Sequence, residues 1–387
     1  MIYKHLPKDF EVNELYNLEE ITNEDEGHGK IYYYFILEKT NYTQLKALEK
    51  VANIFKVRRD DIHFAGTKDR VGITRQIISV KGIKKHTFEN NIKFFNQRLG
   101  PDLKLRFIDR FNSRVSLGDN LGNKFIITLR DLDEEEINTI KQTISKIQQQ
   151  GVPNYFDEQR FGYAGNSHII GKYVLQNNLE LAVKEILTSL PPNPREGFLN
   201  FSNQIKENWE EIKNQNQKLI STIIKSAPKF YKNECRMLRH LHDHKNDFPG
   251  SFRVIHKKLR TLYINAYQSY LFNEALNKLK PLESPESLDS LELMHKDLDL
   301  STSYGKIYKK LIEEDSLSQD SFTLQSSPEL LQEKTSRKVK IYPRNIKVKC
   351  IAKDDEFEAK KKIILSFELE KGAYATNVIK QLSKQNL

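Results

Sequence analysis

Alternating apolar and polar residues predict β-strands along the first third of the chain. The strongest segment is residues 30–38 (KIYYYFILE), which is dominated by aromatic and β-branched side chains. Two helices are predicted among the strands, one capped by Thr43 and one begun by a capping box of Asp133 and Glu136. The other predicted strands are residues 7–14, 62–65, 74–80, 103–108 and 124–130.

Each predicted helix carries apolar residues three and four positions apart, which places them on one face. The second helix is expected to end near Gly151. The apolar positions are Leu45, Leu48, Ala52 and Phe55 in the first helix, and Ile137, Ile140, Ile144 and Ile147 in the second.

After Gly151 the pattern becomes helical, and strand character returns only near position 335. A long helix is predicted over 253–276, whereas residues 282–334, rich in Ser, Glu, Asp and Leu, are expected to be the least ordered or most variable region, with residues 304–311 as a candidate ordered element. Strands are again predicted over 338–342, 347–351 and 363–369, before a terminal helix. Strands mixed with helices in this order predict an α+β fold whose sheet is largely antiparallel. The C-terminal strands would rejoin the N-terminal sheet, and the middle would be an inserted domain.

Composition narrows the possible partners and compartment. The 387 residues carry a net charge of +10, which suits a polyanion such as RNA or an anionic membrane surface. Cys235 and Cys350 are too few for a disulfide framework. No apolar run has the length of a membrane span, and the N-terminus lacks a signal-peptide core. We therefore expect a protein of a reducing compartment, the cytoplasm, with no membrane association.

The candidate chemistry lies in a polar turn between two of the predicted strands. Gly66 would provide the turn with a positive φ, and Asp69 would stand between the cations Lys68 and Arg70. Nearby positive charge favours an ionised carboxylate, which can act as a nucleophile, a base or a metal ligand. The alternative is a solvated turn whose aspartate only caps its own backbone.

Metal and cofactor motifs are weak. His240, His242 and His244 crowd three imidazoles, but only His240 and His244 would share a helix face, and the neighbouring Arg236 and Arg239 would repel a cation. The alternative there is a basic surface. No P-loop, dinucleotide-binding motif or nucleophile elbow is present, so no cofactor is expected. Aromatic residues beside cations, such as Phe156 near Arg160, fit either RNA stacking or ordinary core packing.

Five separated blocks resemble, in order, the motifs of TruD-type tRNA pseudouridine synthases. The GNKF block contains the family's N-x-F motif, and the block beginning at Gly151 departs from the family by carrying Asp157 in place of Gly. The stretch 282–334 matches no motif of the family. The blocks are residues 65–70 (AGTKDR) followed by Thr74 and Gln76, 122–125 (GNKF), 151–162 (GVPNYFDEQRFG), 265–273 (NAYQSYLFN) and 371–376 (KGAYAT).

The resemblance implies a cofactor-free isomerase that breaks the C1′–N1 bond of a uridine in tRNA and rejoins the uracil through C5. The implied substrate position is uridine 13, in the D-arm. The implied fold is a catalytic pseudouridine synthase domain with a mixed, mainly antiparallel sheet (1–152 and 340–387), plus an inserted α/β TRUD domain (153–339). Asp69 matches the catalytic aspartate. Phe10 and Tyr374 match stacking positions, Asn123 a hydrogen-bonding position beside Asp69, Phe125 the aromatic residue of the N-x-F motif, and Lys4 a basic partner of the aspartate.

Two other classes of function remain at this stage. One is a non-catalytic RNA-binding or RNA-folding factor on the same scaffold. The other is a metal-dependent nuclease that uses Asp69, although the carboxylates that two-metal chemistry requires are missing nearby. No protein partner is implied, and the sequence gives no oligomeric state.

Overall fold

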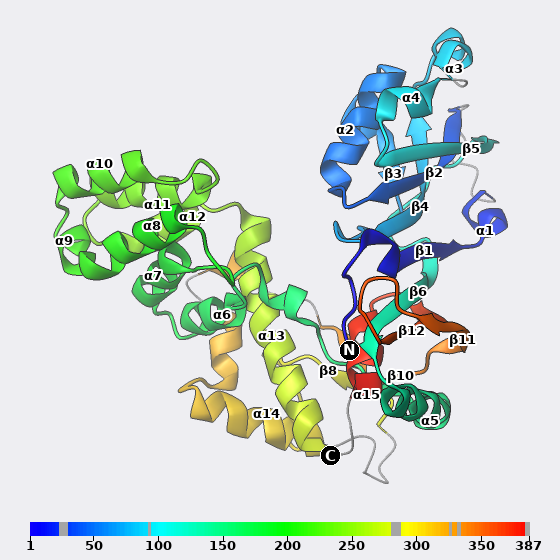
Figure 1. Cartoon of the computed structure of the whole chain (residues 1–387). Coiled ribbons are helices and arrows are strands. Elements are labelled where there is room, and N and C mark those ends of the chain that lie inside the picture. The colour runs from blue at the N-terminus through cyan, green and yellow to red at the C-terminus, as the bar shows by residue number, and fades with distance from the viewer. Residues whose placement is uncertain (23–29, 92–93, 280–287, 325–326, 331–333, 384–387) are drawn as a thin grey trace. The chain divides into compact units, whose positions relative to one another are not determined.

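The computed structural model describes the chain except for residues 23–29, 92–93, 280–287, 325–326, 331–333 and 384–387 (Figure 1). It divides into two compact units. The first comprises Met1–Val152 and Ile341–Leu387, and the second comprises Pro153–Lys340. The second unit therefore interrupts the chain of the first, and each has its own apolar core.

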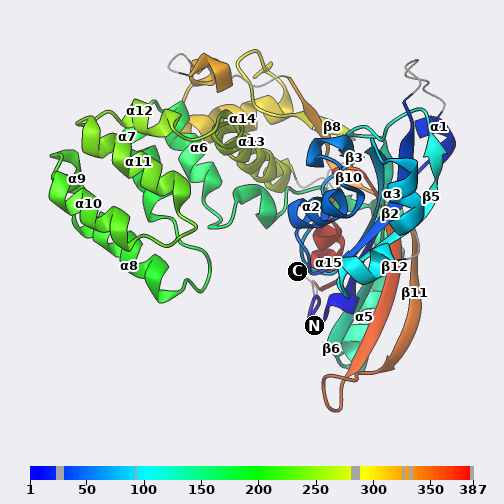
Figure 2. The same ribbon diagram turned by 90° about the horizontal axis from the view of Figure 1, so that it is seen from above.

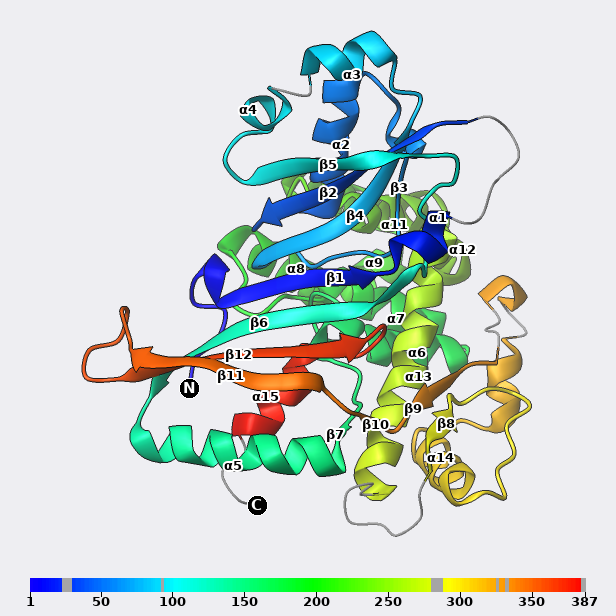
Figure 3. The ribbon, with the colours of Figure 1, turned by 90° about the vertical axis from the view of Figure 1, so that its right-hand side faces the viewer.

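A single large sheet organises the first unit. Among the described residues its eight strands follow the order β11-β12-β6-β1-β4-β2-β5, with β3 beside β4 (Figure 3). Of these strand pairs β1–β4 is parallel and the rest are antiparallel, so the predicted mixed, mainly antiparallel sheet is confirmed. The strands are β1 (Phe10–Tyr16), β2 (Tyr32–Thr40), β3 (Ile62–Phe64), β4 (Ile73–Lys81), β5 (Leu103–Phe111), β6 (Asn120–Leu132), β11 (Arg344–Lys353) and β12 (Lys361–Glu370).

Helices α2, α4, α5 and α15 cover one face of this sheet, which we call the inner face; Figure 2 shows α2 and α15 on the same side of it, whereas α1 contributes Ile21 to a smaller cluster on the opposite face. Two apolar clusters lie there, one between α5, α15 and strands β1, β6 and β12, the other between α2, α4 and strands β2, β4 and β5. The first unit contains η1 (Pro7–Asp9), α1 (Leu18–Thr22), α2 (Gln44–Phe55), η2 (Arg59–Asp61), α3 (Lys85–Asn91), α4 (Phe95–Leu99), α5 (Glu134–Gln150) and α15 (Ala375–Ser383).

Of the two predicted helix caps, the structure contains the side-chain hydrogen bonds of one and not of the other. The capping box of α5 is confirmed, because Asp133 Oδ1 accepts from the Glu136 amide at 2.8 Å and Glu136 Oε2 accepts from the Asp133 amide at 2.9 Å. Thr43 is the N-cap of α2, but its side chain makes no capping hydrogen bond. The predicted apolar face of α2 is wrong at Leu45, which is 54% exposed, since the buried face turns through Ala47 and Val51 instead.

The second unit is mainly helical. Helix α13 spans its apolar core, and among the described residues the strands within it are the short pair β8–β9, while the β7–β10 pair lies at the boundary with the first unit. Strands are thus a smaller part of this unit than an α/β domain implies, because its apolar residues recur mostly at helical spacing. The strands are β7 (Val152–Pro153), β8 (Ser290–Glu292), β9 (Ser336–Lys338) and β10 (Lys340–Ile341).

The helices of this unit include the predicted long helix, which begins four residues later than expected, at Lys257. They are η3 (Glu158–Phe161), α6 (Ser167–Leu175), α7 (Leu179–Thr188), α8 (Glu196–Glu207), α9 (Trp209–Lys213), α10 (Gln217–Ser226), α11 (Lys232–Asp243), α12 (Phe248–Arg253), α13 (Lys257–Leu279), α14 (Ser303–Glu314), η4 (Gln319–Thr323) and η5 (Pro328–Leu330).

The expectation of low order over 282–334 is wrong for most of that stretch. Met294 and Tyr308 are fully buried in the core of the second unit, and Thr302 caps α14 through its hydroxyl. Residues 282–287, 325–326 and 331–333 lie outside the described residues. The Leu and Tyr residues scattered among the acidic and Ser residues supply the apolar face that packs this region. In the part of the chain that the structure describes, no helix is long and apolar enough to cross a membrane.

Candidate active site

In one part of the inner face, the central strands carry polar side chains at positions where the alternation of apolar and polar residues predicts apolar ones. Directly paired residues of neighbouring strands point to the same face of a sheet. The register therefore places polar side chains where the pattern calls for apolar ones, in the gap between the two inner clusters. These inward polar residues are Glu14 on β1, Lys39 on β2, Thr74 and Gln76 on β4, and Asn123 on β6.

Strand β4 shares one of its edges between two partners at this level. Its first residues, Ile73 to Arg75, pair with β1, whereas Ile78 to Val80 pair with β3 (Figure 3). At the gap between the two partners the amide of Ile77 donates to Glu14 Oε2 at 3.0 Å. The chain from 65 to 72, which we call the Asp69 loop, leaves β3 and returns to β4 beside this fork.

Side chains of three elements hold the main chain of the Asp69 loop. Gln44 at the start of α2 accepts from the Lys68 amide at 2.7 Å, and Gln76 donates to the Gly66 carbonyl at 3.2 Å. The Lys39 ammonium donates to the carbonyl oxygen of Asp69 itself. The side chain of Asp69 remains exposed, so the carboxylate projects from an anchored backbone.

Lys39 is the most unusual ionisable group of the site. It is 1% exposed, and among the described residues no carboxylate forms an ion pair with it. Burial lowers the pKa of Lys39 to about 8, against a smaller opposing effect of the charge of Asp69. Lys39 was missed at the sequence level, although a lysine following Tyr33, Phe35 and Leu37 at an inward position was the signal that could have found it.

Lys68 does not serve as the counter-cation of Asp69 that the sequence suggested. Its ammonium pairs with Glu14 Oε1, and both side chains are largely buried, at 6% and 0% exposed. Burial raises the pKa of Glu14, although the charge of Lys68 opposes that effect. Because removing one partner of a buried ion pair leaves an uncompensated charge, this pair fixes the position of the loop relative to β1.

The expectation for Gly66 is also wrong, since its backbone is not left-handed and a Cβ added there would lie 3.7 Å from its nearest neighbouring atom. The constrained glycines lie elsewhere. At Gly72, with φ +99°, a Cβ would come within 2.2 Å of the Phe10 carbonyl oxygen, and at Gly122, with φ +150°, within 2.1 Å of that of Leu369. Gly122 thereby allows β6 to approach β12 just before Asn123.

Three buried polar atoms near the loop lack hydrogen-bond partners within the described residues: Asn123 Oδ1, Thr74 Oγ1 and Gln76 Oε1. Asn123 pairs directly with Glu14 across β1 and β6, so it lies next to the residue that holds Lys68. An unpaired buried polar atom costs about 1–3 kcal/mol, and native proteins contain few of them. Three such atoms close together on the inner face are consistent with polar groups that a bound ligand would satisfy.

Phe10, Phe125 and Lys4 form a contiguous group at the edge of the first inner cluster. The rings of Phe10 and Phe125 lie 6.1 Å apart, and the Lys4 ammonium lies 4.2 Å from the centre of the Phe10 ring. Phe10 is 3% exposed, so its ring offers little surface for stacking on a base. Among the ion pairs of the described residues, none joins Lys4 to Asp69.

Tyr374 lies one residue before α15 and is half-buried. The preceding Lys371 donates to the carbonyl of Gly118 at 3.1 Å, and the amide of Gly118 donates to the carbonyl of Ala65 at 2.8 Å. These two bonds connect the segment of Tyr374 to the first residue of the Asp69 loop. Thr376 Oγ1, on the first turn of α15, is a further buried atom without a partner in the described part of the chain.

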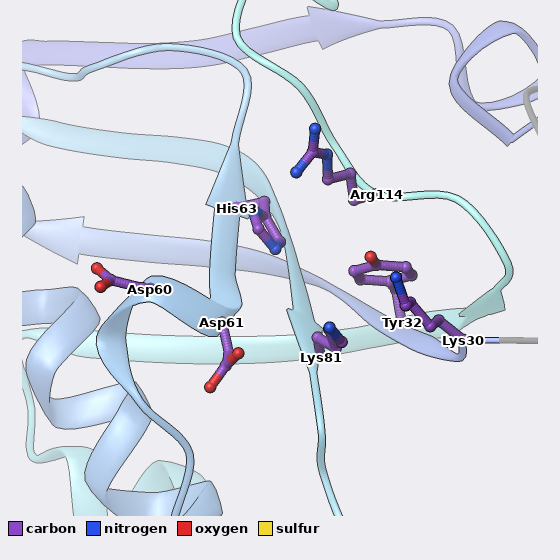
Figure 4. A pocket seen from close by; sticks show the side chains of 7 residues that line it. All are labelled: Lys30, Tyr32, Asp60, Asp61, His63, Lys81 and Arg114. Atoms are coloured by element: carbon purple, nitrogen blue, oxygen red, sulfur yellow. The ribbon is translucent and has the colours of Figure 1, made fainter. Parts of the chain in front are cut away.

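A hollow of about 360 Å³ lies on the opposite face of the sheet, away from the predicted site residues. Figure 4 shows side chains from β2, β3, β4, η2 and a loop around it. Its charges are mixed, and Asp61 already pairs with Arg58 at 3.2 Å. The lining residues are Lys30, Tyr32, Asp60, Asp61, His63, Lys81 and Arg114.

Two of the blocks that resemble family motifs meet in the second unit. Asn273 of α13 accepts from the Phe156 amide at 2.8 Å and donates to its carbonyl at 2.9 Å, and Ser269 accepts from Arg160 at 2.9 Å. The Arg337 guanidinium lies 4.1 Å from the centre of the Phe156 ring. Helix α13 therefore fixes the loop that carries Asp157.

Comparison with known proteins gives a consistent result. The family model for tRNA pseudouridine synthase D (TruD) matches residues 1–296 and 289–382. A Methanocaldococcus jannaschii protein assigned as tRNA pseudouridine synthase D 2 is 31% identical, with 97% of this chain and 90% of that protein covered. A Methanococcus maripaludis protein assigned as tRNA pseudouridine synthase D 1 is 28% identical, with 99% of both chains covered. The crystal structure of a Methanosarcina mazei protein assigned as tRNA pseudouridine synthase D (TruD) superposes with a TM-score of 0.77 at 25% identity, covering 99% of this chain and 93% of that one.

Proposed function

The chain belongs to the TruD family of tRNA pseudouridine synthases, which makes it an isomerase, and from this we propose that it converts a uridine of tRNA through the carboxylate of Asp69. The single observation that carries the assignment of Asp69 is its placement. Asp69 is an exposed carboxylate on a loop whose main chain is held by the buried Lys39 ammonium, at the level of the inward polar residues.

The proposed reaction needs only groups that the chain supplies. The C1′–N1 bond of the uridine breaks, the freed uracil rotates, and a bond forms between C5 and C1′, while the proton lost from C5 is balanced by one gained at N1. A carboxylate can assist by adding to C1′, by adding to C6 or by removing a proton from the sugar. We propose Asp69 for this role, with the uridine at position 13 of the D-arm as the substrate.

The surrounding residues receive supporting roles in this proposal. Asn123 Oδ1 is buried and without a partner in the described structure, so we assign it a hydrogen bond to the extruded uracil. Tyr374 is half-buried at the edge of the site and would stack on the base, which repays part of the cost of extruding it. Phe10 and Phe125, with Lys4 over the Phe10 ring, would support the site from within the apolar cluster.

We assign residues 1–152 and 340–387 to the catalytic pseudouridine synthase domain and 153–339 to the TRUD domain. The inward polar residues and the Asp69 loop all belong to the first unit, which supports this division. A tRNA substrate also favours the cytoplasm as the site of action.

A non-catalytic RNA-binding factor is the second candidate, because a basic protein on this scaffold can bind RNA without changing it. The buried polar groups of the candidate active site disfavour this function. A buried ammonium and unpaired buried acceptors are costly for a protein that only binds phosphates.

The test is single-turnover isomerisation of an unmodified tRNA transcript in EDTA, with Asp69→Asn as the variant and Asp109→Asn, an exposed aspartate on β5, as the control. Asp69→Asn is expected to lose turnover by at least about a thousandfold while binding tRNA like the wild type, because an amide is neither a nucleophile nor a base. Asp109→Asn should behave as wild type. Turnover of Asp69→Asn within about tenfold of wild type would refute the assignment.

A second readout separates the candidate functions. A binder would leave every uridine unchanged in the wild-type reaction, and a metal-dependent nuclease would cleave the RNA only without EDTA. Mapping pseudouridine in the product identifies the position, and a modified uridine outside the D-arm would refute that part of the proposal.

A further inference from the structure

Helix α11 presents a row of three cations that the proposed active site does not use. Lys232, Arg236 and Arg239 lie four and three residues apart, which places them on one helix face, and all three are exposed. The opposite side of the helix is buried through Leu238 and Leu241. We call the three cations the α11 stripe.

No carboxylate neutralises the α11 stripe in the described part of the chain, where none of its members forms an ion pair. Glu234, the acidic residue of the same helix nearest to them, is turned toward the core, and burial raises its pKa. The acidic residues that follow pair with histidines, Asp243 with His242 and Asp247 with His240, each at 2.7 Å. His240 and His242 therefore each hydrogen-bond to a carboxylate oxygen.

This arrangement is unfavourable for the helix alone. Like charges four residues apart repel, and Lys232 stands at the first residue of α11, where the helix dipole disfavours a cation. A polyanion bound along the helix face would relieve both effects. The chain's net charge of +10 adds to the attraction of a polyanion to this face.

An aromatic ring projects beside the α11 stripe. Phe230 is 84% exposed, two residues before the helix, and follows the exposed Lys229. The next residue, Tyr231, packs inward with its ring 5.0 Å from those of Phe198 and Phe201. Since Tyr231 is anchored in this way, Phe230 is held outward, where an unpaired base can stack on it.

We propose that the α11 stripe binds the phosphate backbone of tRNA and that Phe230 stacks on an unpaired base next to it. The inference rests on the proposed function only in taking tRNA as the partner. It assigns the second unit a direct part in holding the substrate, through three phosphate contacts separate from the Asp69 loop.

The experiment compares Lys232→Gln/Arg236→Gln/Arg239→Gln with a matched triple variant on α14, Lys306→Gln/Lys309→Gln/Lys310→Gln. The α14 lysines are also exposed and equal in number, but Glu313 and Glu314 follow Lys309 and Lys310 by one helical turn. Binding of an unmodified tRNA transcript is measured over a salt series in the full chain, with Asp69→Asn in every variant so that the RNA does not change.

The stripe variant is expected to make the negative slope of log affinity against log salt shallower by about 2 to 3, because each lost phosphate contact removes about 0.7–0.9 from its magnitude. The α14 variant should change it by less than about 1, with the melting temperatures of both equal to that of the parent. Phe230→Ala should weaken binding about fivefold or more at an unchanged slope, since a stacked ring releases no counterions.

Three results would overturn the proposal: an unchanged slope in the folded stripe variant, an equal change in both triple variants, or loss of binding to anionic lipid vesicles with unchanged tRNA binding. If the stripe variant melts lower, the double variant Lys232→Gln/Arg239→Gln repeats the comparison. Because the readout is binding, the result does not depend on whether Asp69 is catalytic.

Discussion

At the scale of single residues, Lys39 is the group whose position is hardest to explain by folding alone. Its pKa falls from 10.5 to about 8, and one pKa unit corresponds to about 1.4 kcal/mol, so burial disfavours its charged form by roughly 3 kcal/mol. A methionine would fill similar space without that penalty. The ammonium is therefore better explained by its hydrogen bond to the Asp69 carbonyl and by its positive charge beside the Asp69 carboxylate.

We expect Lys39→Met to be at least as stable as the wild type at pH 7 while its turnover falls about tenfold or more. The charged lysine destabilises the native state below pH 8, and this penalty is lost as the pH rises toward 10.5, because the native state releases the proton that the unfolded chain still binds. The stability difference between variant and wild type should therefore shrink over that range. Urea unfolding at several pH values and single-turnover rates measure both effects.

Lys50→Met is the matched control for this prediction, because Lys50 also donates to a main-chain carbonyl, that of Leu99 at 3.0 Å, but is exposed on α2. It should change neither turnover nor the pH dependence of stability. A Lys39→Met enzyme with wild-type turnover would show that Lys39 only fills space.

The sequence allowed Asp69 to be singled out, but not the side chains that hold it. Lys68 and Arg70 flank Asp69 in sequence, whereas the structure uses Lys39, Gln44 and Gln76 from other elements. Charge proximity along the chain says little about pairing in three dimensions, because Lys68 finds Glu14 instead. The useful signal was the polar residue at an inward position of an alternating strand, which costs free energy unless it has a partner or a function.

At the scale of elements, the close approach of β6 and β12 depends on one glycine. Gly122 adopts φ +150° and faces the Leu369 carbonyl oxygen, so any side chain there must push the two strands apart. Asn123 and Phe125 follow on the same strand, which links the geometry of this pairing to the proposed uracil-binding residues.

Gly122→Ala is therefore expected to lower the free energy of unfolding by about 2 kcal/mol or more and to reduce turnover of the remaining folded protein. Gly118→Ala provides the comparison, because Gly118 has φ +98° but a Cβ added there would meet no atom within 4 Å. It should cost only about 1 kcal/mol from the backbone alone. Equal losses in thermal melts of the two variants would rule out the strand contact as the cause.

Local patterns predicted most elements of the first unit. Aromatic alternation gave β2 to within two residues, and the capping box gave the start of α5. The division of one edge of β4 between β1 and β3 could not be predicted from local patterns, because it depends on which strands become neighbours after the chain has folded. The face of α2 was misjudged because spacing alone does not say which side of the helix meets the sheet: Ala47 and Val51 are buried, and Leu45 is turned away from the core.

At the scale of the whole molecule, the ends of the inserted segment lie together. Strand β7 pairs with β10, so Val152 and Ile341 are joined by the same short ladder. Each unit also has its own apolar core.

A chain in which 152 is joined to 341 by a short Gly-Ser linker should therefore fold cooperatively, since closing so short a loop costs little entropy. Its tRNA affinity should fall well below that of the full chain, because the α11 stripe is removed with the second unit. Circular dichroism, thermal melting and tRNA titration check these expectations. A chain without a cooperative transition would show that the first unit requires the second to fold.

The pairing of β6 between β1 and β12 has a consequence during protein synthesis. The ribosome completes β1 and β6 early, but β12 emerges only after the entire second unit has been made. Until then one edge of β6, a strand that carries Ile126 and Ile127, has unpaired amides and carbonyls that another nascent chain can pair with. Strand β12 reaches β6 only after the insert has been synthesised, so rapid folding of the insert, or a chaperone, would protect that edge in the meantime.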